Sequence, residues 1–291
     1  MRKLIIPGLL FAALWATGSV AIKFGLNSAD PLILAAMRFI GTGLLFGPIY
    51  FSRKDARFWP VKAEWKPILI YGLLNTTLTL GSFSASQRYA SAGISTLFIA
   101  ITPLVIAFFG AGLLKRKLRK AEVWGLLIAF AGLILASLLD LKEATIKPLG
   151  IALLLTYVIT YAFSSIYFSR LKLSLSNEVF NVWQVFWGGL ILLPLAGLFG
   201  QKHVQHWDLN LFGAMLWMII ALSVLANQLW LHLIKTDAVA AGTWLYLVPV
   251  FGYAYGYLLL HERITIGAIL GTVLVIAGLM VSMGRDKIDS H

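Results

Sequence analysis

Long apolar stretches separated by short polar segments follow one another along the whole chain. Each is close to the roughly 20 residues that an α-helix needs to cross a hydrocarbon core of about 30 Å. Polar residues interrupt the third and the eighth. The ten stretches are 4–25, 31–51, 66–86, 91–114, 121–140, 147–169, 178–200, 209–231, 238–260 and 264–283. The pattern therefore predicts ten transmembrane helices.

The composition supports this interpretation. Of the 291 residues, 59% are hydrophobic and 12% are charged, and the mean hydropathy is +0.85, whereas a soluble domain carries about 25% charged residues. The first stretch follows Arg2 and Lys3, as in a signal peptide, but it has no clear cleavage site of small residues, so we interpret it as a first membrane helix. We expect an all-α integral membrane protein.

The basic residues indicate the orientation. The net charge is +12, but the lysines and arginines lie between apolar stretches, which favours a role in topology over nucleic-acid binding. With the N-terminus in the cytoplasm, 17 of the 24 fall in cytoplasmic segments, five in outside segments and two within stretches. We therefore expect a multi-pass protein of the cell membrane (the inner membrane of a bacterium), with both termini in the cytoplasm.

Two parts of the chain repeat each other at an offset of 146 residues. Residues 102–135 match residues 248–281, but the hinge KRKLRKAE of the first is strongly basic and the hinge HERITIGA of the second is not. The same offset pairs Pro103 with Pro249, Gly125 with Gly271, Gly132 with Gly278, Trp15 with Tyr161 and Ser19 with Ser165.

Five helices in each half place the halves in opposite orientations, so only the first hinge faces the cytoplasm. We expect two inverted five-helix repeats, residues 1–145 and 146–291, around a central cavity.

Three segments also resemble a known family. WATGSVAIKFGLNSADPLILAAMRF is similar to the opening of EamA-type members of the drug/metabolite transporter superfamily, and the runs from Gln87 to Leu135 and from Thr236 to Val281 resemble later helices of that family. The resemblance covers essentially the whole chain. It implies a ten-helix, two-repeat carrier with a central cavity, in a family that usually exports amino acids or other small metabolites.

Polar and aromatic residues within the stretches are candidates for substrate contact. Polar groups are costly to bury in a membrane, so their presence there points to a function. Some share a helix face at a spacing of four, and others lie beside the paired prolines. The predicted substrate-binding residues are Trp15, Ser19, Lys23, Asn75, Thr79, Phe98, Tyr157, Tyr161, Asn227, Trp244 and Tyr246. For Lys23, extension to the outer surface is the alternative interpretation. For Arg38 we expect a structural role.

The acidic residues narrow the substrate class. All twelve lie at or beyond the ends of the stretches, so no carboxylate is placed to pair with a cation in mid-membrane. We therefore expect a secondary transporter, an exporter of small neutral or zwitterionic metabolites such as aromatic or apolar amino acids, working by alternating access. A multidrug exporter of organic cations is the alternative.

Other classes of protein fit the sequence less well. A membrane enzyme would need a catalytic motif such as HExxH or GxSxG, a channel would need a recognisable filter, and a sensor would carry a signalling domain; none of these is recognisable. No cofactor or metal is expected, and the partners are a small-molecule substrate and the lipid bilayer. We expect a monomer, although the small residues at Gly252 and Gly256, and at Gly267 and Gly271, also permit a homodimer.

Overall fold

The computed structural model describes residues 2–53, 57–113, 120–142, 146–200, 204–236 and 241–283. Within these residues the regular elements are helices, and Ala90 and Ile146 form an isolated β-bridge. The predicted all-α class is therefore confirmed. Residues 114–119, which include most of the basic hinge, and residues 284–291 at the C-terminal end lie outside the described residues.

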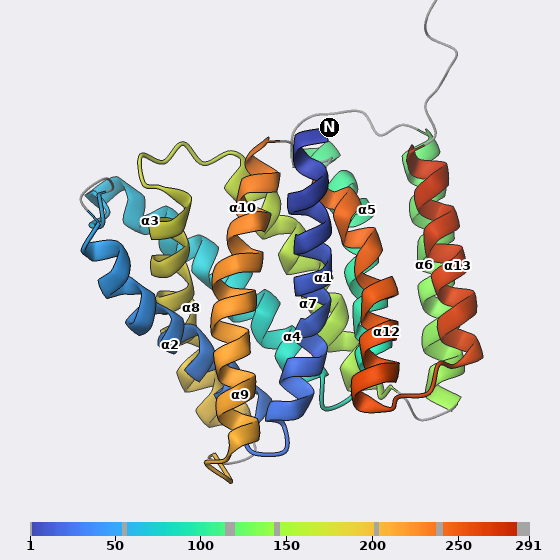
Figure 1. Cartoon of the computed structure of the whole chain (residues 1–291). Helices are drawn as coiled ribbons and strands as arrows, with labels where there is room; N and C mark the ends of the chain where they lie inside the picture. The colour runs from blue at the N-terminus through green and yellow to red at the C-terminus, as the bar shows by residue number, and fades with distance from the viewer. Residues whose placement is uncertain are drawn as a thin grey trace, which may run out of the picture.

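Figure 1 shows the helices side by side. The first half contains α1 (Arg2–Gly25), α2 (Pro31–Phe51), α3 (Lys62–Tyr71), the π-helix η1 (Gly72–Leu80), α4 (Gly81–Ser86), α5 (Ala92–Leu113) and α6 (Lys120–Lys142). The second contains α7 (Pro148–Ser169), α8 (Asn177–Phe199), α9 (Leu209–Trp217), the π-helix η2 (Met218–Ala226), α10 (Asn227–Thr236), the 3₁₀ helix η3 (Thr243–Leu247), α12 (Val248–Leu260) and α13 (Ile266–Met283).

Seven helices of the described chain are long and apolar enough to cross a membrane. They correspond to the first four, the sixth, the seventh and the eighth predicted stretches. The fifth, ninth and tenth contain shorter apolar helices, Val123–Ala136, Trp244–Leu260 and Ile266–Gly278. The number of ten spans therefore remains a prediction, whereas a multi-pass membrane protein is well supported.

The distribution of polar and apolar side chains is that of a membrane protein. Large apolar side chains are exposed at the surface, among them Leu209 (89%) and Leu198 (76%), while amides such as those of Asn75 and Gln184 are buried. In water this arrangement would expose far more apolar surface than a soluble monomer carries. In a lipid bilayer the exposed apolar side chains face the hydrocarbon, and the buried polar groups form hydrogen bonds inside the protein.

The third and eighth predicted stretches are the two that polar residues interrupt, and both contain a π-helical segment. η1 and η2 are each nine residues long and lie 146 residues apart. In η1 the hydroxyls of Thr77 and Thr79 donate to the carbonyls of Gly72 (3.5 Å) and Leu74 (2.7 Å), five residues earlier. These threonine side chains thus bond carbonyl groups in the wider turn of the π-helix. Short π-helical segments are found often at functional sites.

The ninth predicted stretch, 238–260, is not one regular helix. Its described part begins at Ala241 and runs through η3 before α12 starts at Val248. Pro249 has no N–H and its ring crowds the carbonyl four residues earlier, so a continuous α-helix is disfavoured there. The Val248 N–H bonds instead to the carbonyl of Leu245, in the tighter 3₁₀ pattern.

Helices 146 residues apart pack against each other: α2 on α8, α5 on α12, and α6 on α13. The glycines show that the last pair is antiparallel, because Gly132 approaches Gly271 whereas Gly125 approaches Gly278. A side chain at any of these glycines would push the helices apart. Figure 1 shows α6 and α13 side by side at one edge of the bundle.

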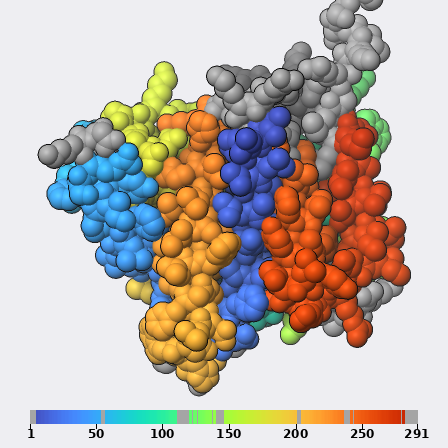
Figure 2. Space-filling view, viewed as in Figure 1, coloured from blue at the N-terminus to red at the C-terminus, as the bar shows by residue number. Residues whose placement is uncertain are grey.

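The other two pairs are antiparallel as well. On α2 and α8, Gly189 lies against Phe39, whereas Gly43 lies against Phe186. On α5 and α12, Gly252 lies against Thr96, and Gly256 approaches Ala92. Figure 2 shows α1 of the first half on one face, between α10 and α12 of the second. The interface between the halves therefore runs through the whole molecule.

Candidate functional site

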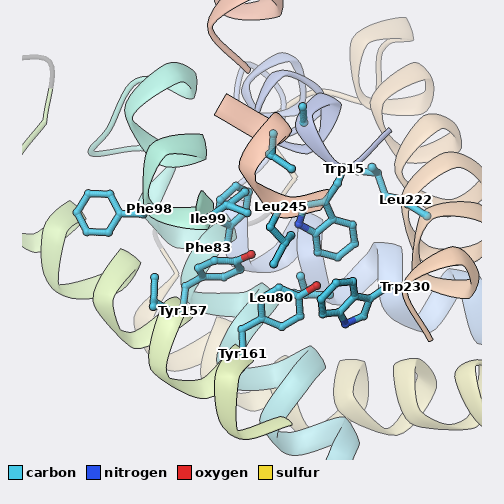
Figure 3. Close-up of a cluster of buried hydrophobic side chains, with 14 of the residues drawn as sticks. Trp15, Leu80, Phe83, Phe98, Ile99, Tyr157, Tyr161, Leu222, Trp230 and Leu245 are labelled. Atoms are coloured by element: carbon cyan, nitrogen blue, oxygen red, sulfur yellow. The ribbon is translucent and has the colours of Figure 1, made fainter. Parts of the chain in front are cut away.

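Aromatic rings from both halves meet in the middle of the bundle (Figure 3). The ring of Tyr161 on α7 stacks on Trp15 of α1, with centroids 6.1 Å apart and planes at 14°. It also packs on Trp230 of α10 at 5.2 Å and on Tyr157 at 5.5 Å, while Trp230 stacks on Phe11 at 5.1 Å. These five side chains, which we call the ring cluster, form an apolar wall at the junction of the halves.

A small cavity adjoins this wall. Its volume is about 20 Å³, which is enough for about one water molecule and far less than a metabolite needs. Its lining comes from both halves of the chain: Trp15, Gly18, Ile22, Arg38, Leu80, Phe83, Ser84, Tyr157 and Leu222. This conformation is therefore closed to a molecule of metabolite size.

A chain of buried polar side chains lies next to the cavity, and we call it the polar chain. The Arg38 Nε donates to Ser223 Oγ (2.7 Å), and the Asn181 amide donates to the carbonyl of Ser223 (2.7 Å). The amides of Gln184 (2.9 Å) and Asn227 (2.6 Å) both donate to Asn181 Oδ1. Thr76 Oγ1 in turn donates to Gln184 Oε1 (2.6 Å). The polar chain thus joins α2 and η1 of the first half to α8, η2 and α10 of the second.

Several buried polar atoms near the junction have no hydrogen-bond partner among the described residues. Among them are Ser19 Oγ, Asn75 Nδ2, Tyr157 Oη, Tyr161 Oη, Asn227 Oδ1 and Trp230 Nε1. A buried polar group left without a partner costs about 1–3 kcal/mol. All of these except Trp230 belong to residues that the sequence predicts as substrate-binding, and their unused bonding capacity suits polar groups of a ligand.

The cavity lining includes two of the predicted site residues, Trp15 and Tyr157. Tyr161 belongs to the ring cluster. Asn227 is part of the polar chain, and Ser19 and Asn75 are buried in the helices around it, on α1 and η1. The structure thus places four predicted residues in the cavity lining, the ring cluster or the polar chain: Trp15, Tyr157, Tyr161 and Asn227.

Lys23 lies elsewhere, at the end of α1. Its Nζ is 3.6 Å from Glu262 and donates to the carbonyl of Gln87 (3.3 Å). The Glu262 carboxylate also accepts the N–H of Ala92 at the start of α5 (2.9 Å), a favourable position for a negative charge. Lys23 therefore lines a surface pocket of about 350 Å³ with Glu262 and three other charged residues: Arg88, Lys147 and Arg263.

The remaining predicted residues also lie apart from the cavity lining. Thr79 uses its hydroxyl to bond Leu74 and Thr160 Oγ1 (2.8 Å), and in Figure 3 the Phe98 ring extends away from Trp15. Trp244 packs over Gly8, near the start of α1, and Tyr246 is half-buried on η3.

Sequence reasoning missed three residues at the centre. For Arg38 the sequence predicts a structural role, and its bond to Ser223 joins α2 to η2, but it also lines the cavity. Phe11 and Trp230 belong to the ring cluster. The 146-residue offset is a signal that would have found Phe11, because it is the equivalent of Tyr157. It also pairs Trp230 with Ser84, which lines the cavity.

The described residues contain no group of three or more His, Cys, Asp and Glu side chains placed to hold a metal ion. The carboxylates of Asp30, Glu64, Asp208 and Glu262 lie at helix ends. Asp30 pairs with Arg88 (3.1 Å), and Glu64 pairs with Arg57 (2.6 Å). Asp208 accepts from Ser28 (2.8 Å). The charged groups at these helix ends are thus engaged in structural contacts.

Comparison with known proteins gives one consistent result. The model of the EamA-like transporter family matches residues 2–138 and again residues 148–284. An "Uncharacterized transporter" of Archaeoglobus fulgidus is 24% identical, with 94% of both chains covered. The "Uncharacterized inner membrane transporter YedA" of Escherichia coli K12 is 28% identical, covering 96% of this chain and 90% of its own. A crystal structure superposes with a TM-score of 0.70 at 18% identity over 97% of both chains, which supports the fold.

Proposed function

Because the chain belongs to the EamA-like transporter family, within the drug/metabolite transporter superfamily, we propose that it is a secondary transporter that works by alternating access. The substrates are small neutral or zwitterionic metabolites, with aromatic or apolar amino acids as the leading candidates, and the direction is export. The site is the junction of the two halves, where the ring cluster and the polar chain meet.

The cavity between the halves is the observation that carries this proposal. Its lining combines the aromatic residues Trp15 and Tyr157 with the polar residues Arg38 and Ser84. Such a mixture of aromatic wall and few polar groups suits a small molecule with an apolar part and a polar head.

The packing of the helices supports the mechanism. Antiparallel contact between helices 146 residues apart is what two inverted five-helix repeats, residues 1–145 and 146–291, would produce. The two matches of one family model, which begin 146 residues apart, support the same division. Rocking of one repeat against the other would open the closed cavity to one side at a time.

An exporter of organic cations is the second candidate. It would need a carboxylate in the cavity to pair with the cation, and the described carboxylates named above lie at helix ends. We therefore propose neutral and zwitterionic substrates first. Both candidates place the protein in the cell membrane without an ATP site, so the driving force is a substrate gradient, exchange or an ion.

Counterflow in proteoliposomes tests the proposed function. Vesicles containing purified protein are preloaded with one unlabelled aromatic amino acid, and uptake of the same labelled amino acid is followed. We expect saturable exchange that Trp15→Ala reduces about tenfold or more, because truncating a large buried side chain at the cavity removes most of its contact area.

The chain provides a matched control in Trp124→Ala. Trp124 lies on α6 with 61% of its surface exposed, on the lipid side, so exchange should remain near that of the unmodified protein. Exchange of an organic cation but not of the amino acid would favour the second candidate. Equal losses in both tryptophan variants would argue against a site at the junction.

A further inference from the structure

Arg38 occupies an unusual position for a charged side chain. It lies three residues from the middle of α2, about 5 Å along the axis at 1.5 Å per residue, and only 4% of its surface is exposed. Charged groups at this depth are costly in a membrane and as a rule face a functional cavity or a partner. Arg38 lines the central cavity.

The protein itself neutralises this charge little. A guanidinium has five N–H donors, and among the described residues the structure gives Arg38 one hydrogen bond, from Nε to Ser223 Oγ. Ser223 is uncharged. The ring of the neighbouring Phe39 lies 5.0 Å from the guanidinium carbon and adds a cation–π contact. Such contacts stabilise the cation without satisfying its remaining donors.

The carboxylates that could neutralise Arg38 are engaged elsewhere. Glu64 pairs with Arg57, Asp30 with Arg88 and Glu262 with Lys23. Each of these pairs lies towards one end of the bundle, whereas Arg38 lies near its middle. In the described part of the chain, the one full charge that lines the central cavity is therefore positive.

We propose that Arg38 binds the carboxylate of the transported molecule and thereby selects substrates that carry one. This inference rests on the proposed function and names the chemical group that its site recognises. A planar guanidinium matches a carboxylate with two parallel hydrogen bonds, and the interaction is strong where water is excluded. The Ser223 contact holds Nε, which orients the two terminal nitrogens.

The apolar wall determines which side chain the substrate can carry. Trp15 and Tyr157 line the same cavity as Arg38, so a molecule bound by its carboxylate would place its side chain against the rings. Aromatic amino acids and arylalkanoic acids fit this description. Their amides and the corresponding amines lack the anion, and they would leave the buried guanidinium unpaired. We therefore expect such analogues to be rejected.

The test uses four molecules that share one ring and differ in the head group: phenylalanine, phenylalaninamide, 3-phenylpropionate and phenethylamine. Each competes with labelled phenylalanine for counterflow in proteoliposomes of the full chain. We expect the two carboxylates to compete, and the amide and the amine to compete at least about tenfold more weakly.

Variants assign this selectivity to Arg38. Arg38→Gln should lose the preference for carboxylates, and Arg38→Lys should keep part of it, because an ammonium retains the charge without the fork of donors. Arg263→Gln removes an exposed positive charge from the loop between α12 and α13 and should leave the preference unchanged. Elution as a single peak in size-exclusion chromatography checks the fold of each variant.

The outcomes separate this inference from the proposed function. Equal competition by phenylalanine and its amide in the unmodified protein would overturn the role of Arg38 while leaving amino-acid transport intact, and this comparison needs no variant. A folded Arg38→Gln protein that keeps its preference would overturn the role as well. Absence of phenylalanine counterflow in the unmodified protein would overturn both proposals.

Discussion

At the scale of residues, the amide of Asn181 is the hub of the polar chain. Its Oδ1 accepts two hydrogen bonds, from Gln184 and Asn227, and its Nδ2 donates to the carbonyl of Ser223. Because these groups are buried, no water replaces a bond that is lost. A single side chain thus keeps α8 in contact with η2 and α10.

Replacing this amide should destabilise the protein. Asn181→Leu keeps the branching of the side chain but removes the partner of the Gln184 Nε2, of the Asn227 Nδ2 and of the Ser223 carbonyl oxygen. We expect a loss of stability of about 1–3 kcal/mol or more, seen as a lower midpoint of thermal unfolding in detergent by tryptophan fluorescence. Asn210→Leu, at an exposed position on α9, is the control. A similar shift in both variants would contradict this role.

At the scale of elements, the π-helix η1 approaches α8 closely because both carry glycine at the contact. A Cβ on Gly188 would lie 2.5 Å from the Cβ of Thr76 and 2.7 Å from the Gly72 carbonyl oxygen. A Cβ on Gly72 would lie 2.7 Å from the carbonyl oxygen of Gln184. The glycines therefore allow the backbone contact that brings Thr76 within reach of Gln184.

The helix α8 provides a matched pair of substitutions at two of its glycines, Gly188 and Gly197. Gly197→Ala adds a methyl group where no atom lies within 4 Å, so it should be neutral or stabilise α8 by up to about 1 kcal/mol through helix propensity. Gly188→Ala gains the same propensity but crowds Thr76, and we expect a net loss of about 1–3 kcal/mol. Thermal unfolding of the two variants would measure the difference. Equal midpoints would show that the contact is not tight.

At the scale of the whole molecule, the packing of equivalent helices defines the architecture. α2 lies on α8, α5 on α12 and α6 on α13, each pair in opposite directions. The closed cavity lies where α1, α2 and α4 meet α7 and η2. A relative movement of the two halves would change this junction more than the interior of either half.

The proposed orientation can be tested with single cysteines, since the chain has none of its own. Arg263→Cys and Arg53→Cys place a thiol at exposed positions, in loops predicted to face outside and the cytoplasm respectively. A membrane-impermeant maleimide should label the first in intact cells and the second only after permeabilisation. The reverse pattern would contradict two cytoplasmic termini.

The sequence alone was enough to determine that the protein is an all-α membrane protein and where most of its helices lie along the chain. Length and hydrophobicity of the stretches predict membrane helices because burial in lipid depends on local composition. The 146-residue offset relates glycines that make equivalent contacts: Gly132 lies against Gly271, and its equivalent Gly278 lies against Gly125. The sequence did not predict the π-helical segments, although they fall in the third and eighth stretches, which polar residues interrupt.

Only the tertiary structure decided which polar residues meet and which do not. Lys23 and Ser19 share a face of α1, yet Lys23 pairs with Glu262 at the end of the bundle whereas Ser19 is buried within it. Arg38 has the predicted structural contact, with Ser223, and only the fold shows that it also lines the cavity. Such contacts join residues far apart in the chain, such as Arg38 and Ser223. The periodicity of a single helix shows which residues share a face, but only the packing of the helices places another residue against that face.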